Sequence, residues 1–135
     1  MNVLVTGGAG FIGSNFVKFM VAKHPNYKII NVDTLTYAGN LENLQDIADI
    51  QNYSFIKADI RDRDMMYKIF KSHDVTSVVN FAAESHVDRS IEEPEVFLTT
   101  NIIGTQVLLD AAKKHWKVHP TDKYCKPIFS FKSKC

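Results

Sequence analysis

Three glycines close to the amino terminus have the spacing of a loop that binds phosphate groups. Gly7, Gly10 and Gly13 follow a short β-branched run at residues 3–5 and precede a segment with helical periodicity. Glycine permits a tight turn there, lets the backbone approach a diphosphate, and allows strand and helix to pack without an intervening Cβ. The first turn of the helix would offer free N–H groups and a partial positive charge to the phosphates. The pattern predicts dinucleotide binding, with a simple tight turn as the alternative.

A carboxylate farther along the chain indicates which dinucleotide the loop would bind. Asp33 ends a second apolar run, at residues 28–32, and stands about 20 residues beyond Gly13. A carboxylate at this place can accept hydrogen bonds from both ribose hydroxyls of NAD, whereas it would repel the 2′-phosphate of NADP. Strand, glycine loop, helix and acid together therefore predict NAD as the cofactor.

The elements that would position these residues alternate between strand and helix. Apolar, β-branched runs predict strands at residues 3–5, 28–32, 53–57 and 76–82, and residues 128–131 could begin a fifth. Helical spacing of apolar residues predicts helices between and after them. The alternation predicts an α/β fold with a parallel sheet and right-handed crossovers. We expect a partial Rossmann fold, a doubly wound sheet with strand order 3-2-1-4 and an uncertain strand five.

Two helices carry specific expectations. The first is expected to bury the apolar residues that recur at helical spacing, namely Ile12, Phe16, Phe19 and Met20. Pro94 is expected in the first turn of a long helix that runs to about residue 115, because the missing N–H of proline costs nothing there.

Composition places the chain among ordinary globular proteins. It has 135 residues, of which 45% are hydrophobic and 23% are charged, so one domain at most is expected. The net charge of +1 gives no reason to expect nucleic acid or a membrane surface as a partner. No run approaches the roughly 18 apolar residues of a membrane span, and no signal-peptide pattern opens the chain. A cytoplasmic protein is the resulting expectation.

Four further segments make the prediction more specific. They are VDTLTYAGNLE at residues 32–42, ADIRD at 58–62, FAAESHVDRS at 81–90 and TNIIGT at 100–105. With the glycine loop TGGAGFIG, they closely resemble the dTDP-glucose 4,6-dehydratases of the extended short-chain dehydrogenase/reductase superfamily. The glycine loop is shared with related sugar-nucleotide epimerases, whereas LTYAGN and AAESHVDRS are far more restrictive. The resemblance covers about residues 1–116, which we expect to form the NAD-binding portion.

The resemblance implies a set of NAD-binding residues, each at the carboxyl end of a strand or just beyond it. These are Gly7, Gly10, Phe11, Ile12 and Gly13 around the diphosphate; Asp33, Leu35 and Thr36 at the adenosine ribose; Asp59 and Ile60 beside the adenine; and Phe81, Ala82, Ala83, Ser85 and Thr100 at the nicotinamide. Ser85 would also reach the sugar of the substrate. His86, Asp88 and Arg89 could supply a base, an acid and a cation, but we interpret them as residues that brace a loop.

The resemblance also implies chemistry for which the chain lacks residues. In the family, a hydride passes from the sugar C4 to NAD, water is eliminated across C5 and C6, and the hydride returns to C6. A Tyr-x-x-x-Lys pair and an STDEVYG motif are needed, and that motif is absent. Tyr53 and Lys57 match the first pattern but on a strand, about 13 Å apart. Tyr67 and Lys71 match it on a helix that leads away from the site. We assign no catalytic residue, and expect NAD binding without turnover of dTDP-glucose.

The last 19 residues, 117–135, no longer resemble the family. They carry five Lys and one Asp and contain both cysteines, Cys125 and Cys135. We expect a divergent basic tail and no substrate domain, as in a truncated or frame-disrupted product. The alternatives are a non-catalytic NAD-binding module and, less favoured, a fragment of an epimerase. The cysteines could bind zinc with His115 and His119, but their spacing fits no familiar module, so no metal is expected.

Two expectations concern self-association. In the superfamily, the helix at residues 94–115 contributes to dimerisation, so the resemblance implies a homodimer. The strand at residues 76–82 is apolar at nearly every position, and without a fifth strand it would form an exposed edge of the sheet. Exposed apolar edges favour self-association.

Overall fold

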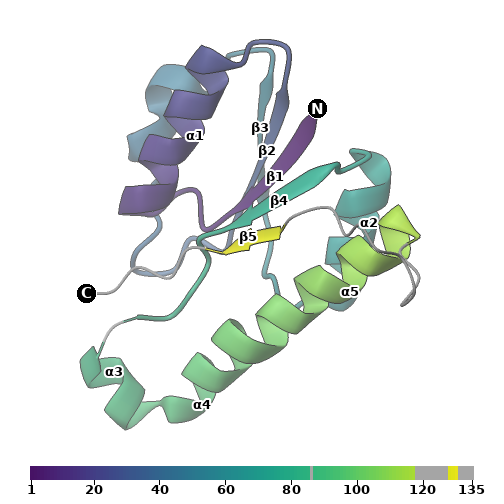
Figure 1. The fold of residues 1–135 in the computed structure, drawn as a ribbon. Coiled ribbons are helices and arrows are strands. Elements are labelled where there is room, and N and C mark those ends of the chain that lie inside the picture. The colour runs from purple at the N-terminus through teal and green to yellow at the C-terminus, as the bar shows by residue number, and fades with distance from the viewer. Residues whose placement is uncertain (86, 118–127, 131–135) are drawn as a thin grey trace.

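The computed structural model describes residues 1–85, 87–117 and 128–130. In these residues the chain forms a parallel sheet with strand order β3-β2-β1-β4-β5 (Figure 1). The strands are β1 (Asn2–Thr6), β2 (Lys28–Asp33), β3 (Tyr53–Lys57), β4 (Ser77–Asn80) and β5 (Ile128–Ser130). The predicted α/β class and the order 3-2-1-4 of the first four strands are confirmed.

β5 corrects the expectation that β4 is an edge strand. It pairs in parallel with β4, placing Val78 opposite Ile128 and Asn80 opposite Ser130. Because β4 also pairs with β1 on its other side, its backbone is satisfied in both directions. On this side of the sheet the edge is instead β5, which has three residues. A short edge strand offers little backbone for pairing with another chain, so the sheet gives no reason to expect association through β4.

Helices cover both faces of the sheet. They are α1 (Phe11–Lys23), the 3₁₀ helix η1 (Leu41–Ile47), α2 (Arg63–Ser72), α3 (Val87–Glu92), α4 (Pro94–Leu98), the π-helical segment η2 (Thr99–Gly104) and α5 (Thr105–Trp116). The long helix predicted from residue 94 is present as the continuous run of α4, η2 and α5, with Pro94 in its first turn. The π-helical segment within it and the short helix α3 were not predicted.

The core lies in two layers, one on each face of the sheet. Leu4, Ile30 and Val78 pack with residues of α2 and α5, whereas Val5 and Ile29 pack with residues of α1 and η1. Successive strand residues point to opposite faces, so strands apolar at nearly every position fill both layers. Within the described ranges, no helix combines the length and the apolarity that a transmembrane span requires.

The buried face of α1 differs in part from the predicted one. Its buried residues are Gly13, Ser14, Val17 and Val21. Of the four residues predicted to be buried, Phe16 and Met20 are partly buried against the core, whereas Ile12 is 50% exposed and Phe19 is 52% exposed. The reason is a close approach at the glycine loop, because a Cβ on Gly13 would collide with the carbonyl oxygen of Gly7. The helix is therefore rotated so that its small residues, rather than its largest apolar ones, face the loop.

Candidate functional site

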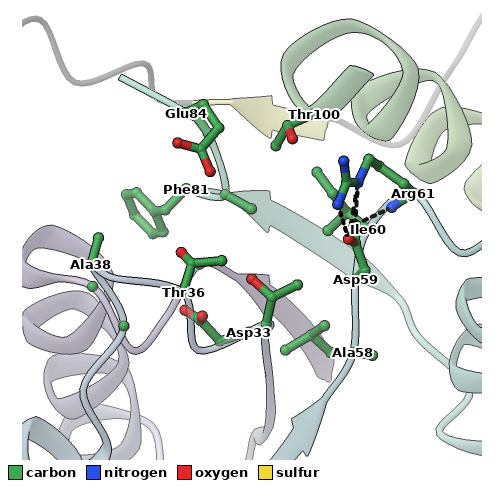
Figure 2. Close-up of a pocket in the computed structure, with 17 residues that line it drawn as sticks. Asp33, Thr36, Ala38, Ala58, Asp59, Ile60, Arg61, Phe81, Glu84 and Thr100 are labelled. Atoms are coloured by element: carbon green, nitrogen blue, oxygen red, sulfur yellow. Dashed lines mark hydrogen bonds and ion pairs between the residues drawn. The ribbon is translucent and has the colours of Figure 1, made fainter. Parts of the chain in front are cut away.

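A pocket opens at the carboxyl ends of the strands, with a volume of about 120 Å³ (Figure 2). Its lining comes from the end of β2, from the segments that follow β1, β2, β3 and β4, and from η2. The lining residues are Gly7, Gly10, Val32, Asp33, Thr34, Thr36, Ala38, Gly39, Ala58, Asp59, Ile60, Arg61, Phe81, Ala82, Ala83, Glu84 and Thr100. Ligands of open α/β sheets bind in this position, outside the carboxyl ends of the strands.

The glycine loop crosses the centre of this edge. Gly7 has a φ of 70°, a conformation that side chains rarely adopt, and a Cβ on it would collide with the backbone of Phe81 and Ala82. Its N–H donates to the carbonyl of Val32 over 2.8 Å. The loop therefore lies between the ends of β2 and β4 and can touch the backbone of both. α1 begins directly after Gly10, so its first-turn amides face the same edge.

The carboxylate of Asp33 is joined to the glycine loop. Oδ2 accepts a hydrogen bond from the Ala9 N–H over 2.9 Å, and Oδ1 accepts one from the Leu35 N–H over 2.8 Å. The side chain is nearly buried, with 8% exposure. A carboxylate has about four acceptor positions, so about two remain for donors from a ligand. The arrangement places a fixed negative charge at the mouth of the loop.

Asp59 and Arg61 form a close ion pair at the end of β3. The guanidinium Nη2 lies 2.6 Å from Asp59 Oδ2, Nε lies 2.9 Å from the same oxygen, and the Arg61 backbone N–H donates to Oδ1 over 2.8 Å (Figure 2). Burial alone would raise the pKa of Asp59, but the hydrogen bonds and charge of Arg61 outweigh it and lower that pKa below its ordinary value. The hydrogen bonds that Arg61 donates to Asp59 in turn raise the pKa of Arg61.

The loop after β4 is clamped to the π-helical segment η2. The Asn101 side chain accepts from the Glu84 N–H and donates to the Glu84 carbonyl, each over 2.9 Å. The Tyr37 hydroxyl donates to Glu84 Oε2 over 3.4 Å from the loop that follows β2. π-Helical segments are frequent at functional sites, and this one places Thr100 in the pocket lining and Asn101 against the loop.

Ten of the predicted cofactor-binding residues line the pocket: Gly7, Gly10, Asp33, Thr36, Asp59, Ile60, Phe81, Ala82, Ala83 and Thr100. The other five lie elsewhere. Phe11 is 83% exposed and Ile12 is 50% exposed at the start of α1. Gly13 is buried beneath the loop, Leu35 packs partly against the core next to α1, and Ser85 is exposed beyond Glu84. The binding roles of all fifteen stay predictions.

Seven lining residues were not predicted: Val32, Thr34, Ala38, Gly39, Ala58, Arg61 and Glu84. All of them lie within a few residues of a predicted site residue. Arg61 and Glu84 carried a usable signal, because each is a charged residue directly after a predicted site residue at the end of a strand. Ala38 and Gly39 gave no such signal, since their position depends on how the loop at residues 34–40 folds back.

Neither tyrosine of the two Tyr-x-x-x-Lys matches lines the pocket. The Tyr53 hydroxyl accepts a hydrogen bond from Asn31 over 3.2 Å, and burial raises the pKa of Tyr53. Tyr67 lies on α2, where its ring faces Lys114 Nζ at 4.4 Å. The sequence predicts no catalytic role for either pair, and the positions of Tyr53 and Tyr67 outside the pocket lining agree with that interpretation.

Several other candidates lie outside the described residues, namely His86, His119, Cys125 and Cys135, as does the side chain of Arg89. In the part of the chain that is described, no group of three or more His, Cys, Asp or Glu is arranged to hold a metal ion.

Comparisons with known proteins agree with the fold and the site. The family model for GDP-mannose 4,6 dehydratase matches residues 4–127. dTDP-glucose 4,6-dehydratase 1 of Escherichia coli K12 is 50% identical over 123 residues, which are 91% of this chain and 34% of that protein. The chain thus spans about a third of the length of the curated relatives it matches.

Solved structures give the same result. A dTDP-glucose 4,6-dehydratase from Streptomyces venezuelae, solved with NAD and TYD bound, is 45% identical with a TM-score of 0.79, covering 86% of this chain and 37% of that one. A UDP-glucose 4-epimerase from Thermotoga maritima, solved with UDP-glucose, is 42% identical with a TM-score of 0.76, covering 85% and 35%. The resemblance to dTDP-glucose 4,6-dehydratases is confirmed. Because the family model spans most of its residues, the chain belongs to the GDP-mannose 4,6 dehydratase family.

Proposed function

We propose that this chain binds NAD at the carboxyl ends of β1 to β4 and is the NAD-binding part of a dTDP-glucose 4,6-dehydratase. The observation that carries the proposal is the hydrogen bond from the Ala9 N–H to Asp33 Oδ2, which joins the carboxylate to the glycine loop in one pocket. A related dehydratase structure holds NAD, which supports the choice of cofactor.

The residues fit the parts of a dinucleotide in their covalent order. The diphosphate would lie over Gly10 and the first turn of α1, where no side chain stands between ligand and backbone. The adenosine ribose would lie at Asp33, whose carboxylate keeps about two acceptor positions free for hydroxyl groups. The nicotinamide would lie towards Ala82 and Thr100, on the other side of the loop. When bound, NAD would supply a hydride acceptor at that end.

The size of the pocket limits what it can hold. Its volume of about 120 Å³ is below the roughly 300 Å³ of a small ligand site. The pocket could therefore take one part of the dinucleotide, while the rest would lie along the open edge of the sheet. Phe11 and Ile12, exposed at the start of α1, would then cover the diphosphate and lose their own exposed apolar surface.

Calorimetric titration of the chain with NAD and with NADP tests this proposal. We expect NAD to bind at least about tenfold more tightly, because the 2′-phosphate of NADP would meet the nearly buried charge of Asp33. Asp33→Asn should weaken NAD binding and reduce the preference. Asp46→Asn is the matched control, because Asp46 is an exposed carboxylate paired with Lys18 away from the pocket. Absence of NAD uptake by the folded chain would refute the proposal.

We propose further that the 135-residue chain does not convert dTDP-glucose. Of the two Tyr-x-x-x-Lys matches in the described residues, neither places its tyrosine in the pocket lining, and the chain contains no STDEVYG segment. Incubation with dTDP-glucose and NAD, followed by mass spectrometry for the 4-keto product, tests this expectation. Formation of that product would contradict it.

The division of the chain at residue 116 also remains a proposal. Residues 1–116 would form the NAD-binding portion, and residues 117–135 would differ from the family in sequence. Residues 128–130 nevertheless belong to the same sheet, because they form β5.

A part of a sugar-nucleotide epimerase is the second candidate, favoured by the similarity to the Thermotoga maritima structure. The AAESHVDRS segment at residues 82–90 favours the dehydratase. Saturation-transfer NMR with dTDP-glucose and UDP-glucose, each with NAD present, compares the two. Transfer to dTDP-glucose supports the dehydratase, and transfer to UDP-glucose alone supports the epimerase.

We also propose that the chain forms a homodimer through the surface of α3, α4, η2 and α5. Large apolar side chains are exposed along it, namely Ile91, Leu98, Ile102, Ile103 and Leu109, with exposed fractions between 45% and 78%. Exposed apolar surface of this kind would be removed from water in a dimer interface.

A further inference from the structure

The strand order assigns a place to the purine of a bound dinucleotide. β1, β2 and β3 are neighbours in that order. The glycine loop follows β1, Asp33 is the last residue of β2, and Ala58-Asp59 follow β3. A diphosphate at the first end and a ribose at the second leave the third for the base that the ribose carries. Ala58 and Ile60 supply apolar contacts there, and Asp59 is the hydrogen-bonding group between them.

Arg61 holds the carboxylate of Asp59 from two directions. Its guanidinium approaches side-on, with Nε at 3.1 Å from Oδ1 and 2.9 Å from Oδ2, and Nη2 at 2.6 Å from Oδ2. From the second direction, the backbone N–H of Arg61 donates to Oδ1 over 2.8 Å. Arg61 Nη1 also lies 3.4 Å from the Thr99 hydroxyl on η2. A planar fork with three fixed donors leaves the carboxylate little freedom to rotate.

The number of acceptor positions decides what the fixed carboxylate can still do. Three N–H groups of Arg61 occupy about three of the roughly four positions of the Asp59 carboxylate. Among the described residues, the hydrogen bonds that the carboxylate of Asp59 accepts all come from Arg61. Two of these groups, Nε and Nη2, donate to Oδ2, so about one acceptor position is left on Oδ1 for a single N–H donor from a ligand.

We infer that Arg61 is a positioning residue that aims this last acceptor at the exocyclic amine of adenine, so that the site prefers an adenine dinucleotide to a hypoxanthine dinucleotide. Hypoxanthine carries a carbonyl oxygen where adenine carries the amine. That oxygen can only accept a hydrogen bond, so it could not pair with the carboxylate oxygen of Asp59. The inference rests on the proposed binding of NAD. The alternative, an ion pair that only braces the loop, is worth little to stability because both side chains are partly exposed, at 42% and 31%.

Two substitutions of Arg61 separate the effect of its charge on dinucleotide binding from the effect of its geometry. Arg61 is the one cation among the described residues that line the pocket, beside the carboxylates of Asp33, Asp59 and Glu84. Arg61→Met would therefore weaken the binding of every dinucleotide, whichever base it carries. Arg61→Lys keeps the charge but replaces the fork with a mobile point charge. It should change the preference between bases far more than the affinity for the hypoxanthine dinucleotide.

Calorimetric titration with NAD and with nicotinamide hypoxanthine dinucleotide tests the inference. The unmodified chain should bind NAD about tenfold more tightly than the analogue, the value of one charge-assisted hydrogen bond. Arg61→Lys should reduce the ratio to below about threefold. Arg63→Lys is the matched control, because Arg63 pairs with Asp110 away from the pocket, and should leave the ratio unchanged.

Asp59→Asn provides a second test of the same coupling. It should abolish the preference for NAD, and adding Arg61→Lys to it should then have no further effect on the ratio. An Arg61→Lys chain that keeps the tenfold ratio, or an unmodified chain that binds both dinucleotides equally, would overturn the inference while leaving NAD binding intact. A folded chain that binds neither would overturn the proposed function and the inference together.

Discussion

Replacement of Gly13 by alanine is the sharpest test of how the glycine loop is built. A Cβ at Gly13 would meet the carbonyl oxygen and carbon of Gly7 and the Cα of Gly8 at distances that real Cβ atoms do not show. All three are backbone atoms, so the contact cannot be relieved by a side-chain rotation. α1 would have to move away from the loop.

The expected cost follows from two opposing effects. Overpacking of this kind costs about 1–3 kcal/mol, and backbone neighbours on every side place it near the upper end. Alanine gains about 1 kcal/mol over glycine within a helix. Gly13→Ala should therefore lower the free energy of unfolding by about 2 kcal/mol.

Gly10→Ala is the matched control three residues earlier. Its Cβ would lie 3.4 Å from the Gly7 carbonyl oxygen and 3.8 Å from that of Ala38, ordinary contact distances, and its φ of −74° suits any residue. The weaker helix cap that alanine makes and its smaller loss of chain entropy on folding roughly offset each other. This variant should change the free energy of unfolding by less than about 0.5 kcal/mol.

Urea denaturation, monitored by the fluorescence of Trp116, measures the free energy of unfolding of both variants. This residue is a suitable probe because its indole N–H donates to the Val75 carbonyl over 2.7 Å and its ring faces Phe70 in the core. Equal stabilities of Gly13→Ala and Gly10→Ala would refute the claim that close approach at Gly13 sets the orientation of α1.

Three other predictions concern the rim of the site and the surface. Because the pKa of Asp59 is lowered in the folded chain, its pairing with Arg61 stabilises the fold above the ordinary pKa of 3.8 and loses this effect as the pH falls through the lowered value. Arg61→Met should thus cost up to about 0.5 kcal/mol at pH 7 and nothing in strong acid, by urea denaturation at each pH; a pH-independent cost would contradict this. Asn101→Ala removes both hydrogen bonds to Glu84 and should speed hydrogen exchange of the Glu84 amide by at least about tenfold; unchanged exchange would show that the clamp does not hold the loop. Leu98→Glu should convert a dimer into a monomer in light scattering after gel filtration, because Leu98 is 58% exposed on the apolar surface of α4; an unmodified chain that is already a monomer would count against the homodimer.

The sheet and the glycine loop could be predicted because their signals are local. β-branched runs mark the strands, and glycine is required at Gly7 because a Cβ there would collide with the backbone of Phe81 and Ala82, in addition to its φ of 70°. Asp33 could be predicted as well, since a carboxylate at the end of β2 lies beside the loop in any parallel sheet with this strand order.

The orientation of α1 could not be read from apolar spacing. Two overlapping faces of that helix contain apolar residues, and the choice between Ile12 and Val17 as a buried residue depends on the contact of Gly13 with Gly7. This contact is between the helix and the loop that precedes it, and it cannot be recognised from the spacing of apolar residues in the helix.

The parts of the site that were missed depend on tertiary contacts. The role of Asn101 requires a π-helical segment in the middle of a long helix and a loop that returns to it from β4. Arg61 follows a predicted residue pair, yet its side-on approach to Asp59 is fixed by the turn after β3. β5 has only three residues, and its pairing with β4 is a contact between segments about 50 residues apart, so this pairing could be suggested but not predicted.

A crystal structure of the chain with NAD bound would test the central claim most directly. We expect the carboxylate of Asp33 to accept hydrogen bonds of about 2.7 Å from the adenosine ribose hydroxyls, with the diphosphate over the first turn of α1. NAD bound elsewhere on the chain, or a ribose turned away from Asp33, would contradict the account.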